Sequence, residues 1–215
     1  MQVLEAGAIL FDMDGTLIDS NRCVDRAWRA WCAATGIALE EVARVSHGAP
    51  CRQTIAQVAP HLDTDREVSR YEALELWYGD DQAPVAGAGA LLEALPAERW
   101  TLVTSAAARI AQFRFRQCRL PYPAAPVTAE SVRRGKPSPE PFLLGAERLG
   151  LSPRDCLVFE DSPAGVQAGL AAGCRVVVVG DLDARQPGVV ARIQDYRNLR
   201  LDATDPLRIT LRTAA

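Results

Sequence analysis

The chain has 215 residues, of which 48% are hydrophobic and 24% are charged, ordinary values for a soluble globular protein. Its formal net charge of −3 excludes the strong positive field that draws a protein to nucleic acid or to an anionic membrane. No apolar run approaches the roughly 18 residues of a membrane helix, and the first residues do not resemble a secretory leader. We therefore expect a cytoplasmic protein with neither kind of partner.

The six cysteines form no C-x-x-C pair, and several of them lie inside apolar runs. This distribution indicates reduced thiols packed in the interior rather than disulfides. With His47 and His61 as its only histidines, the chain also has few ligands for a zinc site.

In chain order, the first predicted strand is the apolar run Ala8–Phe11. About ninety residues separate it from the next predicted strand, far more than one crossover needs. This interval contains helical spacing between Ser20 and Gly36, and a capping-box pattern at Thr64–Glu67 that opens a second helix. We interpret residues 18–82 as an inserted helical cap domain.

After this insertion, short apolar runs alternate with helical patterns. Helices are expected to begin at Ser138-Pro139 and at Ser162-Pro163. The alternation predicts an α/β protein with a doubly wound, Rossmann-like parallel sheet, formed by residues 1–17 and 83–215. A short edge strand is expected near Leu199–Leu201. The other predicted strands are Trp100–Thr104, Ala125–Thr128, Cys156–Phe159 and Arg175–Val179.

Polar side chains follow four of the five main predicted strands. In open parallel sheets, ligands bind beyond the carboxyl ends of the strands, so these side chains are expected to converge. Carboxylates, hydroxyls and one ammonium group suit a hard cation together with a phosphate. The residues, in strand order, are Asp12 and Asp14, then Thr104 and Ser105, then Lys136, and finally Glu160 and Asp161.

Each of these elements also has an ordinary structural interpretation. The segment from Asp12 to Thr16 could be a turn around Gly15. Lys136 could be a solvated charge in a loop, and Glu160 and Asp161 could cap the following helix. The joint occurrence in this order is what favours a functional site.

The four segments together resemble the motifs of the haloacid dehalogenase superfamily. The place and helical character of the insertion are similar to the cap of its β-phosphoglucomutase-like and bacterial sugar-phosphatase branch. The resemblance covers nearly the whole chain, and four ordered motifs are highly specific. The segments are Phe11–Leu17, Val103–Ser105, Gly135–Phe142 and Phe159–Gly165.

This resemblance implies a Mg²⁺-dependent phosphatase that hydrolyses small sugar or polyol phosphate monoesters through an aspartyl-phosphate. Asp12 would be the nucleophile, Asp14 the general acid and base, and Lys136 the cation that neutralises the phosphoryl oxygens. Mg²⁺ would be held by the Asp12 side chain, the Asp14 backbone carbonyl and Asp161. Glu160 would bind the metal directly or orient its waters.

The resemblance leaves the substrate-binding residues open. Either Thr104 or Ser105 could hold a phosphate oxygen. In the cap, His47 and Arg52 lie in a segment that resembles the specificity loop of this branch, where they could contact sugar hydroxyls or a second anionic group. They could equally be a surface histidine and the start of a solvated helix.

We expect a monomer.

Two other functions compete with hydrolysis. In β-phosphoglucomutase a cap histidine lies twelve residues past the nucleophile, whereas this chain has Val24 there, which argues against a hexose-phosphate mutase. The presence of Asp14 argues against a dehalogenase, because halide leaves without a proton. The other competing function is a non-catalytic phosphate-binding module, which the intact Asp12, Asp14, Lys136 and Asp161 disfavour.

Overall fold

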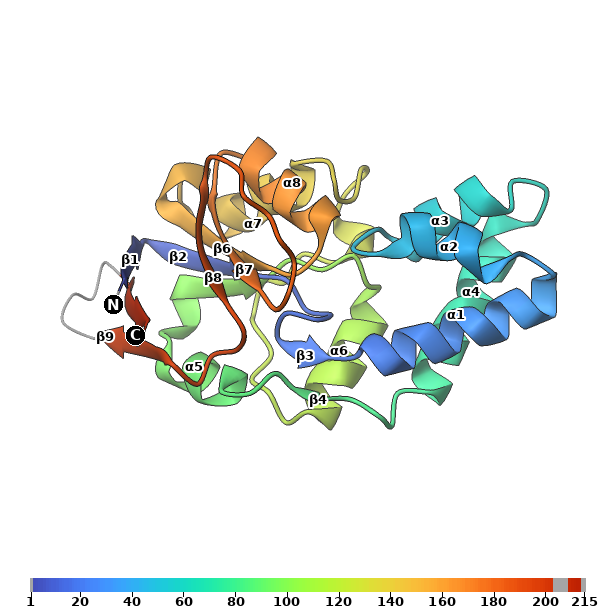
Figure 1. The fold of residues 1–215 in the computed structure, drawn as a ribbon, viewed down its shortest axis with the longest axis horizontal. Helices are drawn as coiled ribbons and strands as arrows, with labels where there is room; N and C mark the ends of the chain where they lie inside the picture. The colour runs from blue at the N-terminus through green and yellow to red at the C-terminus, as the bar shows by residue number, and fades with distance from the viewer. Residues whose placement is uncertain (1, 203–208, 214–215) are drawn as a thin grey trace.

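The structure, a computed structural model, describes residues 2–202 and 209–213. Figure 1 shows a core that contains the main sheet and, at one end of it, a separate group of helices. In the described part of the chain, no helix combines the length and the apolar character needed to cross a membrane.

The core is built on one five-stranded parallel sheet with the strand order β5-β2-β6-β7-β8. This order places β2, which precedes Asp12, between β5 and β6, so residues after all three strands reach one edge. The α/β class and the parallel sheet are therefore confirmed. The strands are β2 (Ala8–Phe11), β5 (Trp100–Leu102), β6 (Cys156–Glu160), β7 (Arg175–Val179) and β8 (Val189–Ile193).

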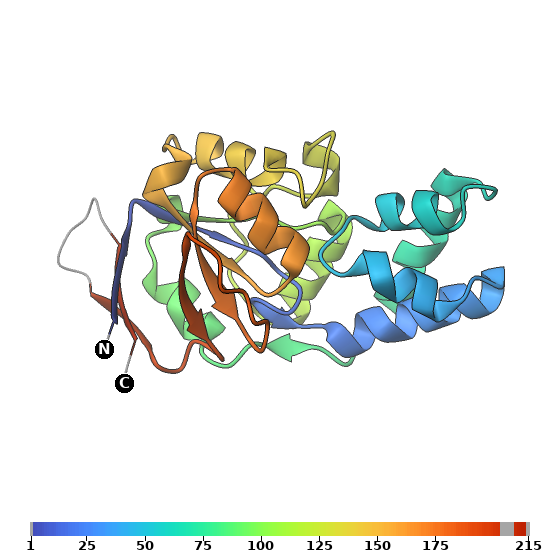
Figure 2. The same ribbon diagram turned by 45° about the horizontal axis from the view of Figure 1, so that its top comes forward.

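Helices cover both faces of this sheet (Figure 2), which is why its strands are apolar on both sides. Along β2, Ile9 and Phe11 enter the hydrophobic cluster beneath α5 and α6. Ala8 and Leu10 point to the opposite face and join the cluster beneath α7 and α8. The helices are α5 (Ala88–Ala94), α6 (Ala108–Gln117), α7 (Glu140–Arg148) and α8 (Pro163–Ala171), with 3-10 turns at Ala97–Arg99, Ala129–Ser131 and Pro153–Asp155.

The predicted strand Ala125–Thr128 is wrong, because only a single parallel bridge joins Val127 to Val103. Pro126 lies in the middle of this segment and has no N–H to donate to a ladder. The neighbouring strand β5 is correspondingly short and ends at Leu102 instead of Thr104.

Sequence analysis also missed several strands, β8 among them. A separate antiparallel sheet in the order β1-β10-β9 joins the beginning of the chain to its end. The strand expected near Leu199 is present, but at the edge of this small sheet. Its strands are β1 (Gln2–Ala6), β9 (Leu199–Asp202) and β10 (Ile209–Thr213).

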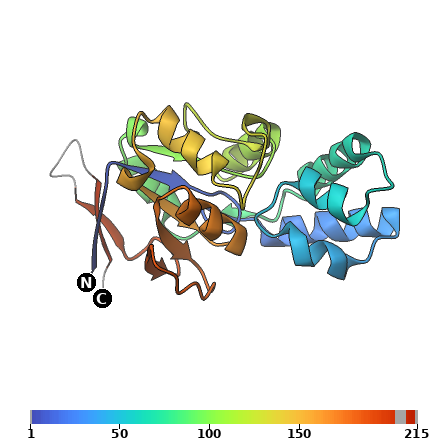
Figure 3. The same cartoon turned by 90° about the horizontal axis from the view of Figure 1, so that it is seen from above.

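Four helices between residues 20 and 78 pack around a hydrophobic cluster of their own. Viewed from above in Figure 3, they form a separate lobe beside the sheet. Trp31 is fully buried in this lobe, and Trp28 stacks on Tyr71 with a centroid separation of 3.8 Å. The helices are α1 (Asn21–Thr35), α2 (Leu39–Ser46), α3 (Cys51–Val58) and α4 (Thr64–Trp77).

The N-terminus of helix α4 is capped by a different residue from the one expected. The helix begins at Thr64, and its N-cap is Asp63, whose carboxylate accepts from the backbone N–H groups of Asp65 and Arg66. An aspartate one residue earlier thus satisfies the donors that the capping box would have served.

Two short strands connect the helical lobe to the core. In β3 (Ile18–Asp19) the chain leaves the core, and in β4 (Ala83–Pro84) it returns, with Ile18 opposite Pro84 in an antiparallel pair. This pair lies beside the proposed boundaries at residues 18 and 82. The division into two domains stays a prediction.

We predict that Trp31→Ala lowers the free energy of unfolding by about 3–5 kcal/mol, because it leaves a cavity in the lobe's core. It also removes the indole donor to the buried Glu67, whose carboxylate accepts at 3.0 Å. Urea unfolding followed by far-UV circular dichroism measures this loss. The matched control is Trp77→Ala, since Trp77 is 79% exposed and its removal should change stability by no more than about 0.5 kcal/mol. Equal effects of the two variants would contradict this account.

Candidate active site

Asp12 lies directly after β2, in a backbone position fixed by the sheet. Its N–H donates to the carbonyl of Phe159 at 3.0 Å, so the parallel pairing of β2 with β6 extends into the loop. The chain then turns tightly at Gly15, whose φ of 80° lies in the left-handed region. A Cβ at Gly15 would also overlap the Asp161 carboxylate. The glycine after Asp14 therefore lets two strand ends approach each other.

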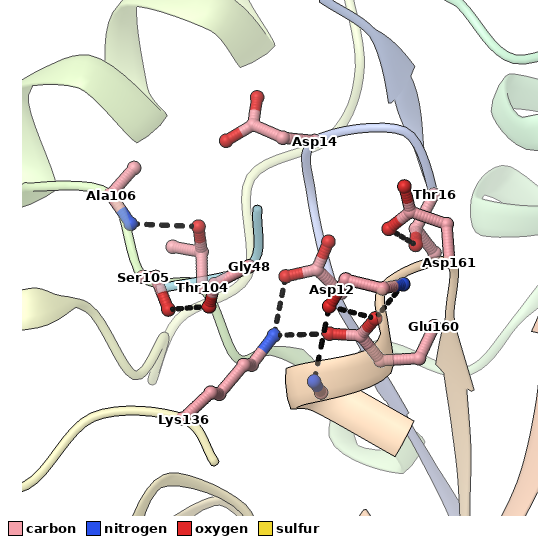
Figure 4. Close-up of polar contacts among 12 residues, drawn as sticks. Asp12, Asp14, Thr16, Gly48, Thr104, Ser105, Ala106, Lys136, Glu160 and Asp161 are labelled. Atoms are coloured by element: carbon pink, nitrogen blue, oxygen red, sulfur yellow. Dashed lines mark hydrogen bonds and ion pairs between the residues drawn. The ribbon is translucent and has the colours of Figure 1, made fainter. Parts of the chain in front are cut away.

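Lys136 joins two of the strand ends through its ammonium group. Nζ donates to Asp12 Oδ1 at 2.5 Å and to Glu160 Oε1 at 2.7 Å (Figure 4). The Lys136 side chain is 1% exposed and that of Glu160 is fully buried. The sequence contains no other lysine, since its remaining basic side chains are arginines.

Burial and charge oppose each other at this cluster. Burial raises the pKa of Asp12 to about 8, an effect that Lys136 opposes and that the negative charges of Glu160 and Asp161 reinforce. Burial alone would lower the pKa of Lys136, but Asp12 and Glu160 raise it, so the ammonium keeps its proton. The protein thus places more carboxylates here than Lys136 can neutralise.

The surplus of carboxylates fits a divalent cation. Oxygen atoms of Asp12, Glu160 and Asp161 lie within 4.8 Å of one another, and hard carboxylate oxygens are the ligands that Mg²⁺ prefers. Asp161 is oriented by Thr16, whose hydroxyl donates to it at 3.1 Å.

Glu160 differs from the other two carboxylates because both of its oxygens already have donors. Oε1 accepts from Lys136, and Oε2 accepts from the backbone N–H of Ser162 at 2.7 Å and from its hydroxyl at 2.9 Å. These contacts favour the interpretation of Glu160 as a residue that orients Lys136 over its interpretation as a direct metal ligand.

The two hydroxyls after β5 have different partners. Thr104 Oγ1 accepts from the backbone N–H of Ala106 at 3.1 Å. Among the described residues, the hydroxyl hydrogen of Thr104 has no acceptor of its own. Ser105 Oγ donates to the carbonyl of Gly48 at 2.8 Å. Gly48 belongs to the loop between α2 and α3, so Ser105 connects the core to the helical lobe formed by α1 to α4. We refer to this lobe as the cap, the name of the insertion expected from the sequence.

A cavity of about 410 Å³ lies between these strand ends and the cap helices. Asp12, Asp14, Thr104 and Ser105 line its core side. The cap side combines apolar walls with polar and charged side chains, among them Asp25, Arg29 and Glu75, and such a mixed lining suits a small polar ligand. Its lining includes Asn21, Val24, Asp25, Trp28, Leu39, Val42, Ser46, His47, Tyr71 and Glu75.

The structure treats the two predicted cap residues differently. His47 lines the cavity, and its Nε2 lies 3.4 Å from Asp161 Oδ2, a contact that raises the pKa of the imidazole. The guanidinium of Arg52 instead pairs with Asp65 at 2.5 Å on the exposed side of the cap. Arg52 does not line the cavity, so the structure does not bring it to the candidate site.

Two residues beside Asp14, Ser20 and Arg114, were not predicted as site residues from the sequence. Figure 4 shows the Asp14 carboxylate turned away from Asp12, and its Oδ1 accepts from Ser20 Oγ at 2.5 Å and pairs with the guanidinium of Arg114. Arg114 also donates to Glu75 of α4 at 2.8 Å. One sequence feature could have identified Arg114. It lies three and four residues after Ala111 and Ile110, on the apolar face of α6, where a charged side chain needs a buried partner.

Comparison with known proteins agrees with this geometry. Residues 6–173 match a family model described as haloacid dehalogenase-like hydrolase. The chain is 43% identical over 178 residues to hexitol phosphatase A of Escherichia coli K12, covering 79% of this chain and 81% of that protein. It is 35% identical over 214 residues to glycerol-1-phosphate phosphohydrolase 2 of Saccharomyces cerevisiae, covering 92% and 86%. A solved β-phosphoglucomutase-like protein of Thermotoga maritima superposes with a TM-score of 0.62 at 28% identity, covering 86% and 93%.

We predict that Lys136→Met destabilises the fold by about 3–5 kcal/mol, because it leaves two buried carboxylates without their cation. The double variant Lys136→Met/Glu160→Gln should recover part of this loss, since one of the two unpaired charges is then gone. Urea unfolding at neutral pH measures both changes. A loss below about 1 kcal/mol in the single variant, or no recovery in the double variant, would show that Lys136 does not neutralise this cluster.

Proposed function

Because the chain belongs to the haloacid dehalogenase-like hydrolases, we propose that it is a Mg²⁺-dependent phosphatase that hydrolyses small sugar or polyol phosphate monoesters through an aspartyl-phosphate. The observation that carries this proposal is the buried contact of Lys136 with Asp12, whose side chain lines the cavity between the strand ends and the cap. A buried carboxylate with a lysine on one oxygen still has its second oxygen to attack phosphorus.

The reaction proceeds in two transfers. In the first, an oxygen of Asp12 forms a bond to phosphorus, the bond from phosphorus to the leaving oxygen breaks, and Asp14 gives that oxygen a proton. In the second, water attacks the aspartyl-phosphate, its proton passes to Asp14, and the phosphorus–Asp12 bond breaks. Lys136 neutralises negative charge that shifts toward the oxygens of the transferring group.

The carboxylates of Asp12 and Asp161 and the backbone carbonyl of Asp14 would hold the Mg²⁺. The bound ion supplies screening of the negative charge on the phosphoryl oxygens and on Asp12. Glu160 keeps Lys136 in place, because its two oxygens are occupied by Lys136 and Ser162.

Thr104 is the better candidate for the second-motif hydroxyl. A phosphate oxygen accepts hydrogen bonds, so its partner must have a hydrogen to give. The hydroxyl of Ser105 gives its hydrogen to Gly48, whereas the hydroxyl of Thr104 accepts from Ala106 and retains its own. Ser105 then serves to hold the cap loop against the core.

The cavity supports a small hydroxylated leaving group. Its cap side offers Asn21, Ser46 and His47 as hydrogen-bonding groups among apolar walls. The relatives named above act on a hexitol phosphate and on glycerol 1-phosphate. Val24 lines the cavity at the position of the mutase histidine, and its side chain cannot transfer a proton, which favours hydrolysis over a mutase. We also infer that the protein acts as a cytoplasmic monomer, without nucleic acid or membrane.

We predict that the purified protein releases inorganic phosphate from sugar and polyol phosphates only when Mg²⁺ is present. EDTA should abolish this release, and Asp12→Asn should lower it by at least about 10³-fold, because the amide cannot form the aspartyl-phosphate. A phosphate-release assay over a panel of sugar, polyol and carboxylate phosphates measures both effects.

Four outcomes of these assays bear on the competing functions. Activity that survives in Asp12→Asn, or no release from any phosphate, would remove the hydrolase proposal. Conversion of glucose 1-phosphate that requires a hexose 1,6-bisphosphate would instead support the mutase, and binding of phosphate without turnover would support the non-catalytic module.

We predict that Thr104→Val lowers kcat/KM by about 10–100-fold, because one donor to the phosphoryl group is lost from a buried site. Ser105→Ala is the matched control and should lower kcat/KM by less than about tenfold, since Ser105 acts through the cap loop. Steady-state kinetics on the best substrate measures both. The reverse ranking would assign the phosphate contact to Ser105.

A further inference from the structure

Arg114 is a buried cation that the proposed mechanism does not use. It lies on α6 of the core, and its side chain is 1% exposed. The guanidinium contacts Asp14 in the loop after β2 and donates to Glu75 of the cap at 2.8 Å. It also lies 3.4 Å from the hydroxyl oxygen of Ser20. One side chain thus joins the core helix, the loop after β2 and the cap.

Both carboxylates that Arg114 binds line the cavity, whereas Arg114 itself lies behind them. A buried guanidinium is costly unless its donors are used and its charge is balanced. Here two carboxylates from different parts of the fold balance it. The rigid fork of a guanidinium holds two acceptors in fixed directions, which a lysine cannot do. The geometry therefore fixes the direction of Asp14 relative to a cap residue.

We propose that Arg114 is a positioning residue that sets the direction of the Asp14 carboxylate and links it to the cap through Glu75. This inference rests on the proposed function, because it assigns to Asp14 the proton transfer to the leaving oxygen. Arg114 touches neither the substrate nor the reacting atoms, and it acts only through Asp14.

The consequence depends on the leaving group. A sugar or polyol oxygen leaves poorly as an anion and needs the proton from Asp14 as its bond to phosphorus breaks. The p-nitrophenolate anion is stable and leaves without a proton. A misdirected Asp14 therefore slows transfer from the first kind of substrate and spares transfer from the second.

The experiment compares Arg114→Met with the wild-type protein. Mg²⁺ is present, and the enzyme is in excess over the substrate, so that each enzyme molecule reacts once. Alcohol release from the best polyol phosphate, followed by rapid quenching, and release of p-nitrophenolate each report the first transfer alone. We expect the rate of alcohol release to fall at least about tenfold, which is part of the roughly 10²–10⁴-fold that a positioned general acid contributes. The rate of p-nitrophenolate release should fall less than about threefold. Equal losses on the two substrates, or no loss, would overturn the proposal.

Arg109 provides a matched control on the same helix. Its guanidinium pairs with Glu72 of α4 at 2.5 Å, so Arg109 also joins the core to the cap. Among the described residues, Arg109 has no polar contact with the loop after β2. Arg109→Met should leave the ratio of the two rates unchanged. A shift of that ratio equal to the one in Arg114→Met would assign the effect to cap attachment in general, and the proposal would fail.

Arg114→Lys is a second variant, which tests the proposal even if Arg114→Met does not fold. It keeps a charge beside Asp14 and Glu75 but lacks the guanidinium fork, so it should fold and show a smaller shift of the rate ratio in the same direction. A ratio like that of the wild type in this folded variant would overturn the proposal if Arg114→Met is insoluble. Failure of the proposed function is distinguishable, since the wild-type protein would then transfer phosphate from neither substrate.

Discussion

The contact of Lys136 with Asp12 and Glu160 is the constraint on which the rest of the core depends. Parallel strands bring their carboxyl ends to one edge, and three acidic side chains meet there. Uncompensated, such a cluster would repel itself and oppose burial. The segment between β5 and β6 delivers one ammonium group to the centre of the cluster. This ion pair permits an acidic cluster inside an apolar fold, and the cluster holds more carboxyl groups than one ammonium group can neutralise.

The same principle recurs where the cap meets the core. Arg114 lies between Asp14 and Glu75 as Lys136 lies between Asp12 and Glu160. Each cation joins two carboxylates from separate elements, one of them in the loop after β2. Between the two pairs, the cap loop contributes Gly48 to a hydrogen bond with Ser105 and His47 to a contact with Asp161. The cavity is thus bounded by polar contacts on the core side and by a mixture of apolar and polar side chains on the cap side.

Sequence reasoning succeeded where local pattern decides structure. The unbroken apolar runs of β6 and β7 and the polar residues at the strand ends follow from burial on two faces and from parallel topology. It failed where contacts between segments far apart in the sequence decide the structure. The strands β1 and β10 pair across almost the whole chain, which no local pattern reveals. Pro126 removed a strand that hydrophobicity alone suggested, and Arg114 became visible as a site residue only once α6 had been placed beside Asp14.

The isolation of Lys136 has a consequence for the chemistry of the whole surface. Because this buried side chain is the only lysine in the sequence, the exterior of the folded protein carries arginines but no lysine amine. Reagents that acylate or alkylate lysines reach Nζ only when the strand-end cluster opens, since the ammonium is enclosed and bonded to two carboxylates. The rate at which such a reagent modifies Lys136 is therefore a direct measure of how often this one place in the native molecule opens.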